Sequence, residues 1–373
     1  MKINDVIIDM HQGINTVADK VEYLDFGIPI IQSKNFTKGY LDLEDVRYLG
    51  EEDEKKYIEK YNPHVGDILM ANIGTIGKSY VITEEQRFLI AWNAFLIKPN
   101  ADKIKSEYLK FYFDFLASTH YFDGLLTGGT VKFINKKKIG DIVVPDKTIT
   151  EQVEICDVLS KVEQVIIKRQ QEIELLDNLI KARFVELFGD ARENPNGYDM
   201  IPFIDIVEYM GDIGSNGANK VVVDHLDMKD EEDYAMMVRF TNFTKNDFSN
   251  DVKYISKEAY DFFKKSQIFG GELIICKIGS AGQNYVMPYL NRPVSLGLNQ
   301  IMVRIKDNIL MPYLYQYLHT DYGEFLISGC INGAVTKTIT KTELKKIPVM
   351  LPPMELQEKF VDFVHQVDKS KFS

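Results

Sequence analysis

The stretch GDILMANIGTIGKSYVI, residues 66–82, recurs as GELIICKIGSAGQNYVM at residues 271–287, at a constant offset of 205 residues. In both copies a glycine opens an apolar run, a G-x-x-G motif follows, and Tyr-Val begins a second apolar run. This pattern predicts a β-hairpin, because glycine readily adopts the positive φ of a tight turn. We therefore expect structural turn residues at Gly74, Gly77, Gly279 and Gly282.

The repeat continues on both sides of this hairpin. Asn-Phe-Thr-Lys occurs at 35–38 and at 242–245, and WNAFLIKP (92–99) corresponds to LNQIMVRI (298–305). GGTVKFINKKKIGDIVV (128–144) corresponds to GAVTKTITKTELKKIPV (333–349). A period near 205 residues is too long for a solenoid and indicates two copies of one domain. We predict an α+β fold, with mixed α/β domains at 1–150 and 190–352.

The triplet Gly77-Lys78-Ser79 is similar to the end of a phosphate-binding loop. That loop needs a glycine at position 72, where this chain has Asn72. The second copy replaces Lys78 and Ser79 by Gln283 and Asn284 while it keeps both glycines. The same scaffold with different polar residues at its tips predicts two related surfaces that recognise different targets.

Residues 151–188 contain no proline or glycine and predict one long helix between the copies. At 1.5 Å per residue it would span roughly 55 Å. Thr150 with Glu154 is the expected N-terminal cap, and Gly189 the expected stop. Apolar residues at alternating steps of four and three predict a coiled-coil seam. The seam consists of Ile155, Leu159, Val162, Ile166, Ile173, Leu176, Ile180 and Leu187.

Residues 353–373 follow the second copy and begin the same helix by the same offset. About twenty residues of the first helix have no counterpart there. Two such helices packed antiparallel would relate the domains by an approximate two-fold axis. Because the distal helix is shorter, part of the first seam would remain bare or be covered by a neighbouring subunit.

Composition and charge limit the classes of function that are open to this chain. The net charge of −11 argues against a generally basic nucleic-acid-binding surface, although local patches matter more than the total. No apolar run is long enough to cross a membrane, and three scattered cysteines fit the reducing cytoplasm. The six histidines form no metal-ligand spacing, and no catalytic motif is present. We expect Trp92 to be a core residue, no catalytic residues and no metal site.

This organisation resembles the specificity (S) subunit of Type I restriction–modification systems. The resemblance lies in GIPIIQSKNFTKGYLDLEDVRYL (27–49), in the two glycine hairpins, and in the Ile/Val-Pro stretches that lead into each helix. It implies two target recognition domains that read a bipartite, asymmetric double-stranded DNA site, with antiparallel helices as ruler and docking surface. It also implies two adenine-methyltransferase (M) subunits and a restriction (R) subunit as partners.

The resemblance further implies that the S subunit itself is not catalytic and binds no cofactor. S-adenosylmethionine and ATP are then expected only on partner subunits that methylate and cleave DNA. An alternative stays open: a truncated or decoy S-like scaffold that binds M subunits without productive DNA recognition.

Polar residues near the predicted hairpin tips are the candidates for DNA contact. Asn and Gln are suited to adenine, and Lys and Arg to guanine or phosphate. The basic run Lys136, Lys137 and Lys138 is expected to be a solvated face. The candidates are Asn35, Thr37, Lys38, Thr75, Lys78, Asn93 and Lys132 in the first copy, and Asn242, Thr244, Lys245, Ser280, Gln283, Asn299 and Lys337 in the second.

Overall fold

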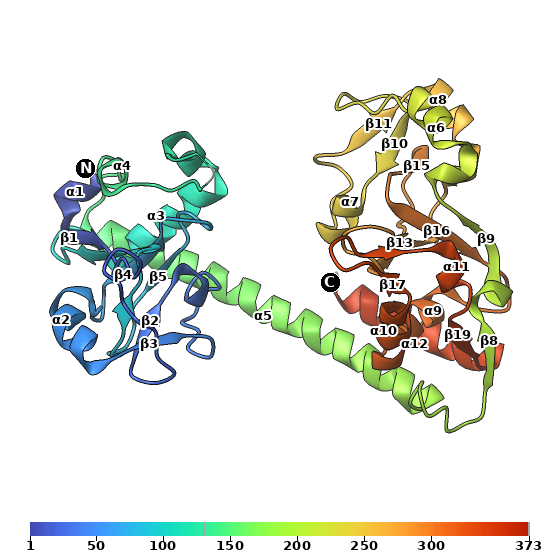
Figure 1. The fold of residues 1–373 in the computed structure, drawn as a ribbon, viewed down its shortest axis with the longest axis horizontal. Helices are drawn as coiled ribbons and strands as arrows, with labels where there is room; N and C mark the ends of the chain where they lie inside the picture. Colours follow the sequence, from blue (N-terminus) through green and yellow to red (C-terminus); the bar gives the residue numbers. More distant parts are fainter. Residues whose placement is uncertain (130, 372–373) are drawn as a thin grey trace. The chain divides into compact units, whose positions relative to one another are not determined.

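The computed structural model describes residues 1–129 and 131–371 (Figure 1). The chain divides into two compact units, unit 1 at Met1–Arg169 and unit 2 at Gln170–Ser373. Every hydrophobic core cluster draws its buried residues from a single unit. Within the described residues, no helix combines the length and the apolar character that a membrane span needs.

Unit 1 is built on two sheets. The first is antiparallel throughout, and the second contains one parallel pair, β2 with β6. The order of the first sheet is β1 (Ile7–Gln12), β7 (Ala94–Pro99), β4 (Ile68–Ala71), β5 (Ser79–Val81), and that of the second is β3 (Arg47–Leu49), β2 (Ile28–Ile31), β6 (Leu89–Ile90).

Unit 2 repeats the strand order of both sheets and adds β12 at one edge of the second. Its parallel pair, β10 with β15, corresponds to β2 with β6. The first sheet has the order β9 (Val207–Gly211), β16 (Gln300–Ile305), β13 (Leu273–Cys276), β14 (Asn284–Val286), and the second β11 (Lys253–Ile255), β10 (Ala235–Val238), β15 (Val294–Leu296), β12 (Gln267–Ile268). The sequence repeat is therefore a repeat of topology, and the predicted α+β class is confirmed.

The first strand of each glycine hairpin is buried on both faces. In β4, Ile68 and Met70 belong to one core cluster, whereas Leu69 and Ala71 belong to another. β13 is placed in the same way between two clusters of unit 2. A strand covered on both faces needs a continuous apolar run instead of an alternating pattern. This is why ILMA and LIIC contain no polar residue.

Short helices and two-stranded ladders complete the units. The helices of unit 1 are α1 (Ile3–Val6), α2 (Glu51–Tyr61), α3 (Ser106–Ser118) and α4 (Lys136–Gly140). Those of unit 2 are α6 (Asn219–His225), α7 (Phe240–Thr244), α8 (Lys257–Phe262), α9 (Met311–Leu318), α10 (Asp321–Gly329) and α11 (Lys341–Leu344). The ladders pair β8 (Asp199–Pro202) with β19 (Pro348–Leu351), and β17 (Ile331–Asn332) with β18 (Thr338–Ile339).

The predicted long helix is α5 (Ile149–Phe188), which begins in unit 1 and ends in unit 2. The predicted cap at Thr150 and Glu154 is wrong by a few residues. Thr148 N donates to Glu151 Oε2 at 2.8 Å, and Glu151 N donates to Thr148 Oγ1 at 3.3 Å, which is a capping box. The helix stops at Gly189, whose φ of +77° favours glycine.

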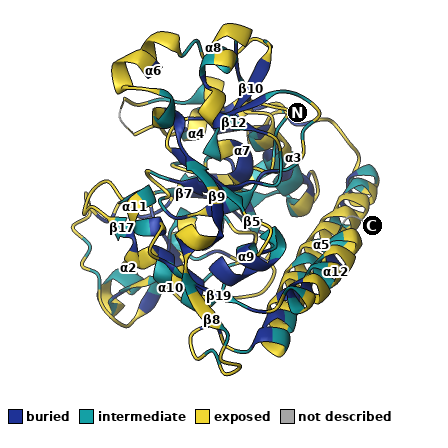
Figure 2. Ribbon diagram, turned by 90° about the vertical axis from the view of Figure 1, so that its right-hand side faces the viewer, coloured by how far each residue is buried: buried dark blue, intermediate teal, exposed yellow. Residues whose placement is uncertain are grey.

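Within unit 2, α12 (Met354–Lys371) packs antiparallel to the last turns of α5 (Figures 1 and 2). Phe360 contacts Phe184 with ring centroids 5.6 Å apart, and Lys371 Nζ lies 2.7 Å from Asp177 Oδ1. The predicted coiled-coil seam does not include Phe184 or Phe188, although both are buried. The buried positions follow Ile180 at steps of four residues, whereas the predicted heptad pattern passes through Arg183. Residues 372–373 of the predicted distal helix lie outside the described residues.

A buried glutamine attaches the start of each helix to its own domain. Gln152 Oε1 accepts from Lys105 N at 2.8 Å, and its Nε2 donates to Lys147 O at 2.9 Å. Gln357 repeats this arrangement with Leu310 N at 2.9 Å and Pro352 O at 2.9 Å. Both side chains are at most 1% exposed. Because the amide satisfies backbone groups on two loops at once, it fixes where each helix leaves its domain.

Candidate nucleic-acid interface

The two glycine hairpins have the same backbone hydrogen bonds. In unit 1, Gly77 N donates to Ala71 O at 3.0 Å, and Lys78 N donates to Thr75 O at 3.1 Å. In unit 2, Gly282 N donates to Cys276 O at 2.9 Å, and Gln283 N donates to Ser280 O at 3.1 Å. Both hairpins therefore display the residues between and after their glycines on the same backbone frame.

Gly74, Gly77, Gly279 and Gly282 all have φ between +75° and +89°. This conformation favours glycine because a Cβ would strain the backbone. At the second glycine there is also no room for a side chain. A Cβ on Gly77 would lie 2.2 Å from the Phe122 ring, and one on Gly282 would lie 2.6 Å from Ile327.

The tip residues Thr75, Lys78, Ser280 and Gln283 are all exposed. A second loop in each unit lies against the start of the hairpin turn. Ile73 forms a β-bridge with Phe133 in unit 1, and Gly279 N donates to Lys337 O at 3.2 Å in unit 2. Lys132 and Lys337 on these loops are exposed as well. The fold thus brings six of the sequence candidates onto two surfaces, three on each.

The structure corrects the prediction that Asn35 and Asn242 contact DNA. They are only 3% and 2% exposed, and their amides hold together the turns that contain them. Asn35 Oδ1 accepts from Gln32 N at 3.0 Å, and its Nδ2 donates to Asp42 O and Asp45 O, both at 3.1 Å. Asn242 accepts from Arg239 N at 2.8 Å and donates to Asp247 O at 3.0 Å. A buried and satisfied amide has no edge left with which to read a base.

The phenylalanines of the Asn-Phe-Thr-Lys motif, Phe36 and Phe243, are buried, whereas its lysines are exposed. Thr37 is half-buried and Thr244 is exposed. Each lysine has a nearby carboxylate. Lys38 Nζ lies 3.3 Å from Asp42, and Lys245 Nζ lies 3.6 Å from Asp251. Exposed pairs of this kind are weak, so both lysines can exchange the carboxylate for a phosphate.

Asn93 and Asn299 differ although they align. Asn93 Nδ2 donates to Ser33 Oγ at 3.1 Å, and its Oδ1 accepts from Ser33 N at 3.3 Å. This half-buried amide is hydrogen-bonded within the protein, and DNA contact at Asn93 stays a prediction. Asn299 is exposed with φ of +60°, and its carbonyl accepts from Lys277 N at 2.7 Å.

The basic run is not a uniform solvated face. Lys138 Nζ donates to Leu125 O at 2.7 Å and is committed to the fold. Lys136 is exposed, and its Nζ lies 3.7 Å from Asp9. Lys137 is exposed. Only the first two lysines of the run are thus placed to meet an external anion.

The sequence analysis missed an ion cluster around a buried carboxylate in unit 2. The Asp212 carboxylate, 6% exposed, lies 2.9 Å from both Lys277 Nζ and Lys341 Nζ. Burial acts to raise the pKa of Asp212, but hydrogen bonds from both lysines outweigh it and lower the pKa to about 2. No motif marks this cluster, because its members are 65 and 129 residues from Asp212 in sequence.

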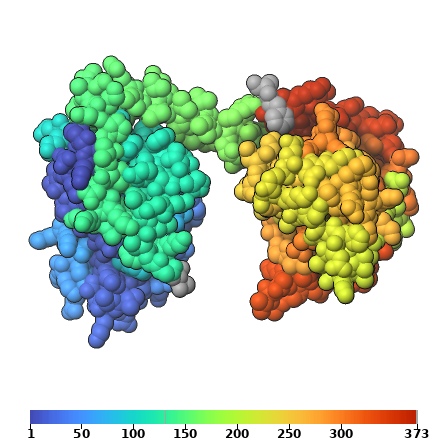
Figure 3. All heavy atoms as spheres, turned by 90° about the horizontal axis from the view of Figure 1, so that it is seen from above, coloured from blue at the N-terminus to red at the C-terminus, as the bar shows by residue number. Residues whose placement is uncertain are grey.

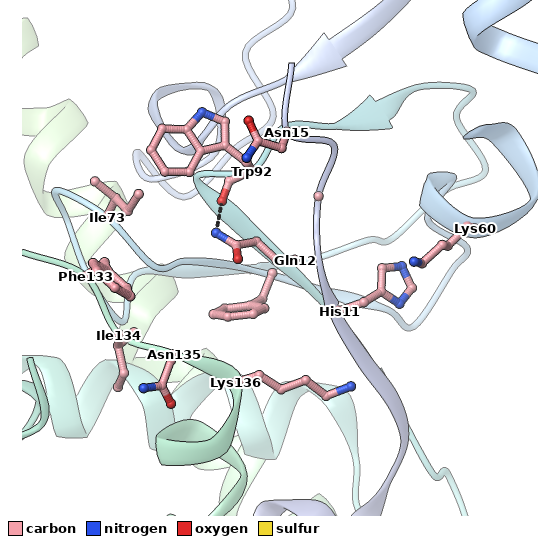
Figure 4. Close-up of a pocket in the computed structure, with 12 residues that line it drawn as sticks. His11, Gln12, Asn15, Lys60, Ile73, Trp92, Phe133, Ile134, Asn135 and Lys136 are labelled. Atoms are coloured by element: carbon pink, nitrogen blue, oxygen red, sulfur yellow. Dashed lines mark hydrogen bonds between the residues drawn. The ribbon is translucent and has the colours of Figure 1, made fainter. Parts of the chain in front are cut away.

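Trp92 is also not where the sequence predicted. It is 40% exposed and lines a hollow of unit 1 together with Gln12, Ile73 and Phe133 (Figure 4). The prediction that Trp92 is a core residue is therefore wrong. The turn after β6 carries the indole outward, while Ala91 and Ala94 beside it supply the buried contacts.

The predicted seam of α5 is divided into a covered and an exposed part. Ile155 packs against the core of unit 1, Ile173 is half-buried, and Leu176, Ile180 and Leu187 belong to the core of unit 2. Leu159, Val162 and Ile166 are exposed, as are Val158 and Val165 beside them. We call these five residues the α5 stripe. Figure 3 shows this part of α5, in green, at the surface of the face in view.

Comparison with known proteins agrees with this architecture. The model of the Type I restriction modification DNA specificity domain matches residues 2–177 and 210–373. A protein named as the MjaX type I restriction enzyme specificity subunit of Methanocaldococcus jannaschii is 22% identical over 98% of this chain and 86% of its own length. The crystal structure of a Type I restriction–modification S subunit from M. genitalium matches with a TM-score of 0.50 and 14% identity, over 100% of this chain and 89% of that one.

Proposed function

This chain belongs to the family of Type I restriction–modification DNA specificity proteins, and on that premise we propose that it reads a bipartite, asymmetric DNA site, one half with each unit. The observation that carries the proposal is the pair of hairpins. Their backbone hydrogen bonds match, whereas Thr75 and Lys78 at one tip are replaced by Ser280 and Gln283 at the other. Two domains that read different half-sites need the same backbone to present different side chains to the DNA, and the two hairpins have this arrangement.

Base recognition depends on the polar atoms at these tips. A lysine ammonium is a donor for the guanine acceptors O6 and N7, and a glutamine amide pairs with adenine N6 and N7. We assign Lys78 and Gln283 to base contacts. Lys132 and Lys337 on the adjacent loops, with Lys38 and Lys245, are assigned to phosphates, which set position without carrying sequence information. This assignment requires only local positive charge on a protein of net charge −11.

The α5 stripe supports a scaffold role. Exposed apolar residues at helical spacing fit the apolar face of partner helices. We propose that α5 and α12 dock two M subunits, and that an R subunit joins the complex. The chain then acts as a non-catalytic targeting subunit in the cytoplasm, with S-adenosylmethionine and ATP bound only by its partners.

The decisive experiment compares the methylomes of cells with and without this chain, both expressing its M partner. A split motif that depends on the chain is expected, with half-site centres about 10 base pairs apart, since both halves must face one side of the duplex. Footprinting of the reconstituted complex would show two protected blocks. A single continuous block, or methylation independent of the chain, would contradict the proposal.

A second candidate function is a decoy scaffold that binds M subunits and reads no DNA. The α5 stripe and the acidic net charge favour it. Co-purification with M subunits together with no salt-sensitive DNA binding would select this alternative. Phosphate-dependent binding instead falls steeply as salt is raised, so a salt titration separates the two functions.

A further inference from the structure

Unit 1 contains a cavity of about 490 Å³ beside its glycine hairpin (Figure 4). It lies where the end of β1, the hairpin turn, the turn after β6 and the loop before α4 meet. Its walls are largely apolar and aromatic, formed by Trp92, Phe133, Phe95, Ile73 and Ile134. Trp92 and Phe133 are 40% and 38% exposed, so two aromatic faces stand open to the outside.

A few polar groups interrupt these walls. Gln12 Nε2 donates to Trp92 O, which orients the amide and leaves Oε1 as an acceptor on the wall (Figure 4). Asn135 Oδ1 accepts from Lys138 N at 3.0 Å, which leaves its Nδ2 as a donor. Lys136 and Lys60 also line the cavity. His11 and Asn15 add further polar atoms to the lining. The site therefore combines stacking faces, several hydrogen-bonding groups and nearby positive charge.

The same place in unit 2 is built differently. Leu96 and Met302 occupy equivalent positions in the two units, and they pair with His11 and Gly211. Gln12 and Asp212 each follow these partners by one residue and are therefore equivalent as well. Asn72, Lys136 and Trp92 correspond to Lys277, Lys341 and Leu298. In unit 2 these positions form the Asp212 ion cluster and carry no aromatic face. The cavity is thus a property of unit 1 and does not follow from the shared fold alone.

The chemistry of the walls identifies the occupant. A volume of about 300–1,000 Å³ suits a small planar group, and aromatic walls with one or two edge-reading amides are how proteins hold an unstacked base. A base inside a stacked duplex exposes only its edges in a groove and has no free face for Trp92. We propose that this cavity receives one nucleobase that has left the stack of the DNA bound by unit 1, with Trp92 stacking on it and Gln12 Oε1 accepting from its edge. This inference rests on the proposed function.

The test uses the full chain alone and duplexes that carry its methylome-defined site. In each duplex one base of the half-site read by unit 1 is replaced by 2-aminopurine, whose fluorescence rises when it is unstacked. Enhancement at one position is expected on binding. Trp92→Leu, which installs the residue of unit 2, should abolish that change in signal and weaken binding about ten-fold, the order of one base–aromatic stack. Trp92→Phe should retain both.

Phe115→Leu is the matched control, since Phe115 is an exposed aromatic residue of unit 1 on α3 and does not line the cavity. Equal thermal unfolding midpoints confirm that all variants fold. Binding without enhancement at any position overturns the cavity proposal and leaves the proposed function standing. Normal DNA binding by Trp92→Leu, together with loss of co-purification with tagged M subunits in a separate pull-down, also overturns it, because the cavity would then serve a protein. Absence of duplex binding both by the chain alone and by its complex with M subunits contradicts both proposals.

Discussion

The Asp212 carboxylate of unit 2 lies 2.9 Å from Lys341 Nζ, whereas the equivalent lysine of unit 1, Lys136, lies 3.7 Å from its nearest paired carboxylate, Asp9. In the first pair the carboxylate is buried and the lysine is half-buried, and Lys277 shares the same carboxylate. The pair of Lys136 and Asp9 is exposed, and its charged atoms are farther apart. The Asp212 cluster ties the hairpin, the end of β9 and α11 together, while the exposed pair leaves Lys136 able to meet an anion.

Asp212→Asn is expected to destabilise unit 2 by about 1–2 kcal/mol at neutral pH, since it removes a charge whose folded pKa is well below the ordinary value of 3.8. A lowered carboxylate pKa contributes stability above pH 3.8, and this contribution is lost as the pH falls toward about 2. Thermal unfolding from pH 7 to pH 2 should therefore show the variant and the parent converging below pH 4. Asp261→Asn, in the exposed pair with Lys257, is the control and should change little. A gap that persists at pH 2 would contradict this account.

Gln357→Leu should lower the stability of unit 2 by about 2–3 kcal/mol, because Leu310 N and Pro352 O lose their buried partner. Gln152→Leu should have a similar effect on unit 1. Urea unfolding monitored by hydrogen exchange resolves the two units separately. Gln171→Leu, exposed on α5, serves as the control. If Gln357→Leu were neutral, the glutamine would not be what fixes the helix to its domain.

Lys78→Gln is expected to change the half-site read by unit 1 and to leave the other half-site unchanged. The variant copies the residue of unit 2, so it replaces a guanine donor by an adenine-reading amide at an identical backbone position. Methylome sequencing measures both halves in one experiment. The reverse change, Gln283→Lys, should alter only the second half-site. Equal changes in both halves would show that these tips act on affinity and not on base choice.

Val162→Asp combined with Ile166→Asp should abolish co-purification with M subunits while the chain itself stays folded. Both side chains are exposed in the α5 stripe, so a charge costs the chain little but would have to be desolvated under an apolar partner. Pull-down with tagged M subunit measures the loss. Gln164→Asp introduces one negative charge on the opposite face of α5 and should bind normally. Undiminished binding by the double variant would place the M subunits elsewhere.

The sequence alone determined the architecture. Two alignable copies with shared glycines and a helix without proline or glycine specify two equal domains and one long α5, because turn geometry and helical periodicity are local properties. The sequence pattern did not predict that Phe184 and Phe188 are buried. Their contacts with Phe360 and Tyr313 show which face of α5 is covered.

Only the tertiary structure decided which polar residues are free to act. Asn35 and Lys38 belong to one motif, yet the Asn35 amide is hydrogen-bonded to backbone groups, whereas the Lys38 side chain is exposed. Trp92 and Gln12 meet at one cavity although 80 residues separate them in sequence. Burial and hydrogen-bond satisfaction depend on what the whole fold places around a side chain, and no local pattern contains that information.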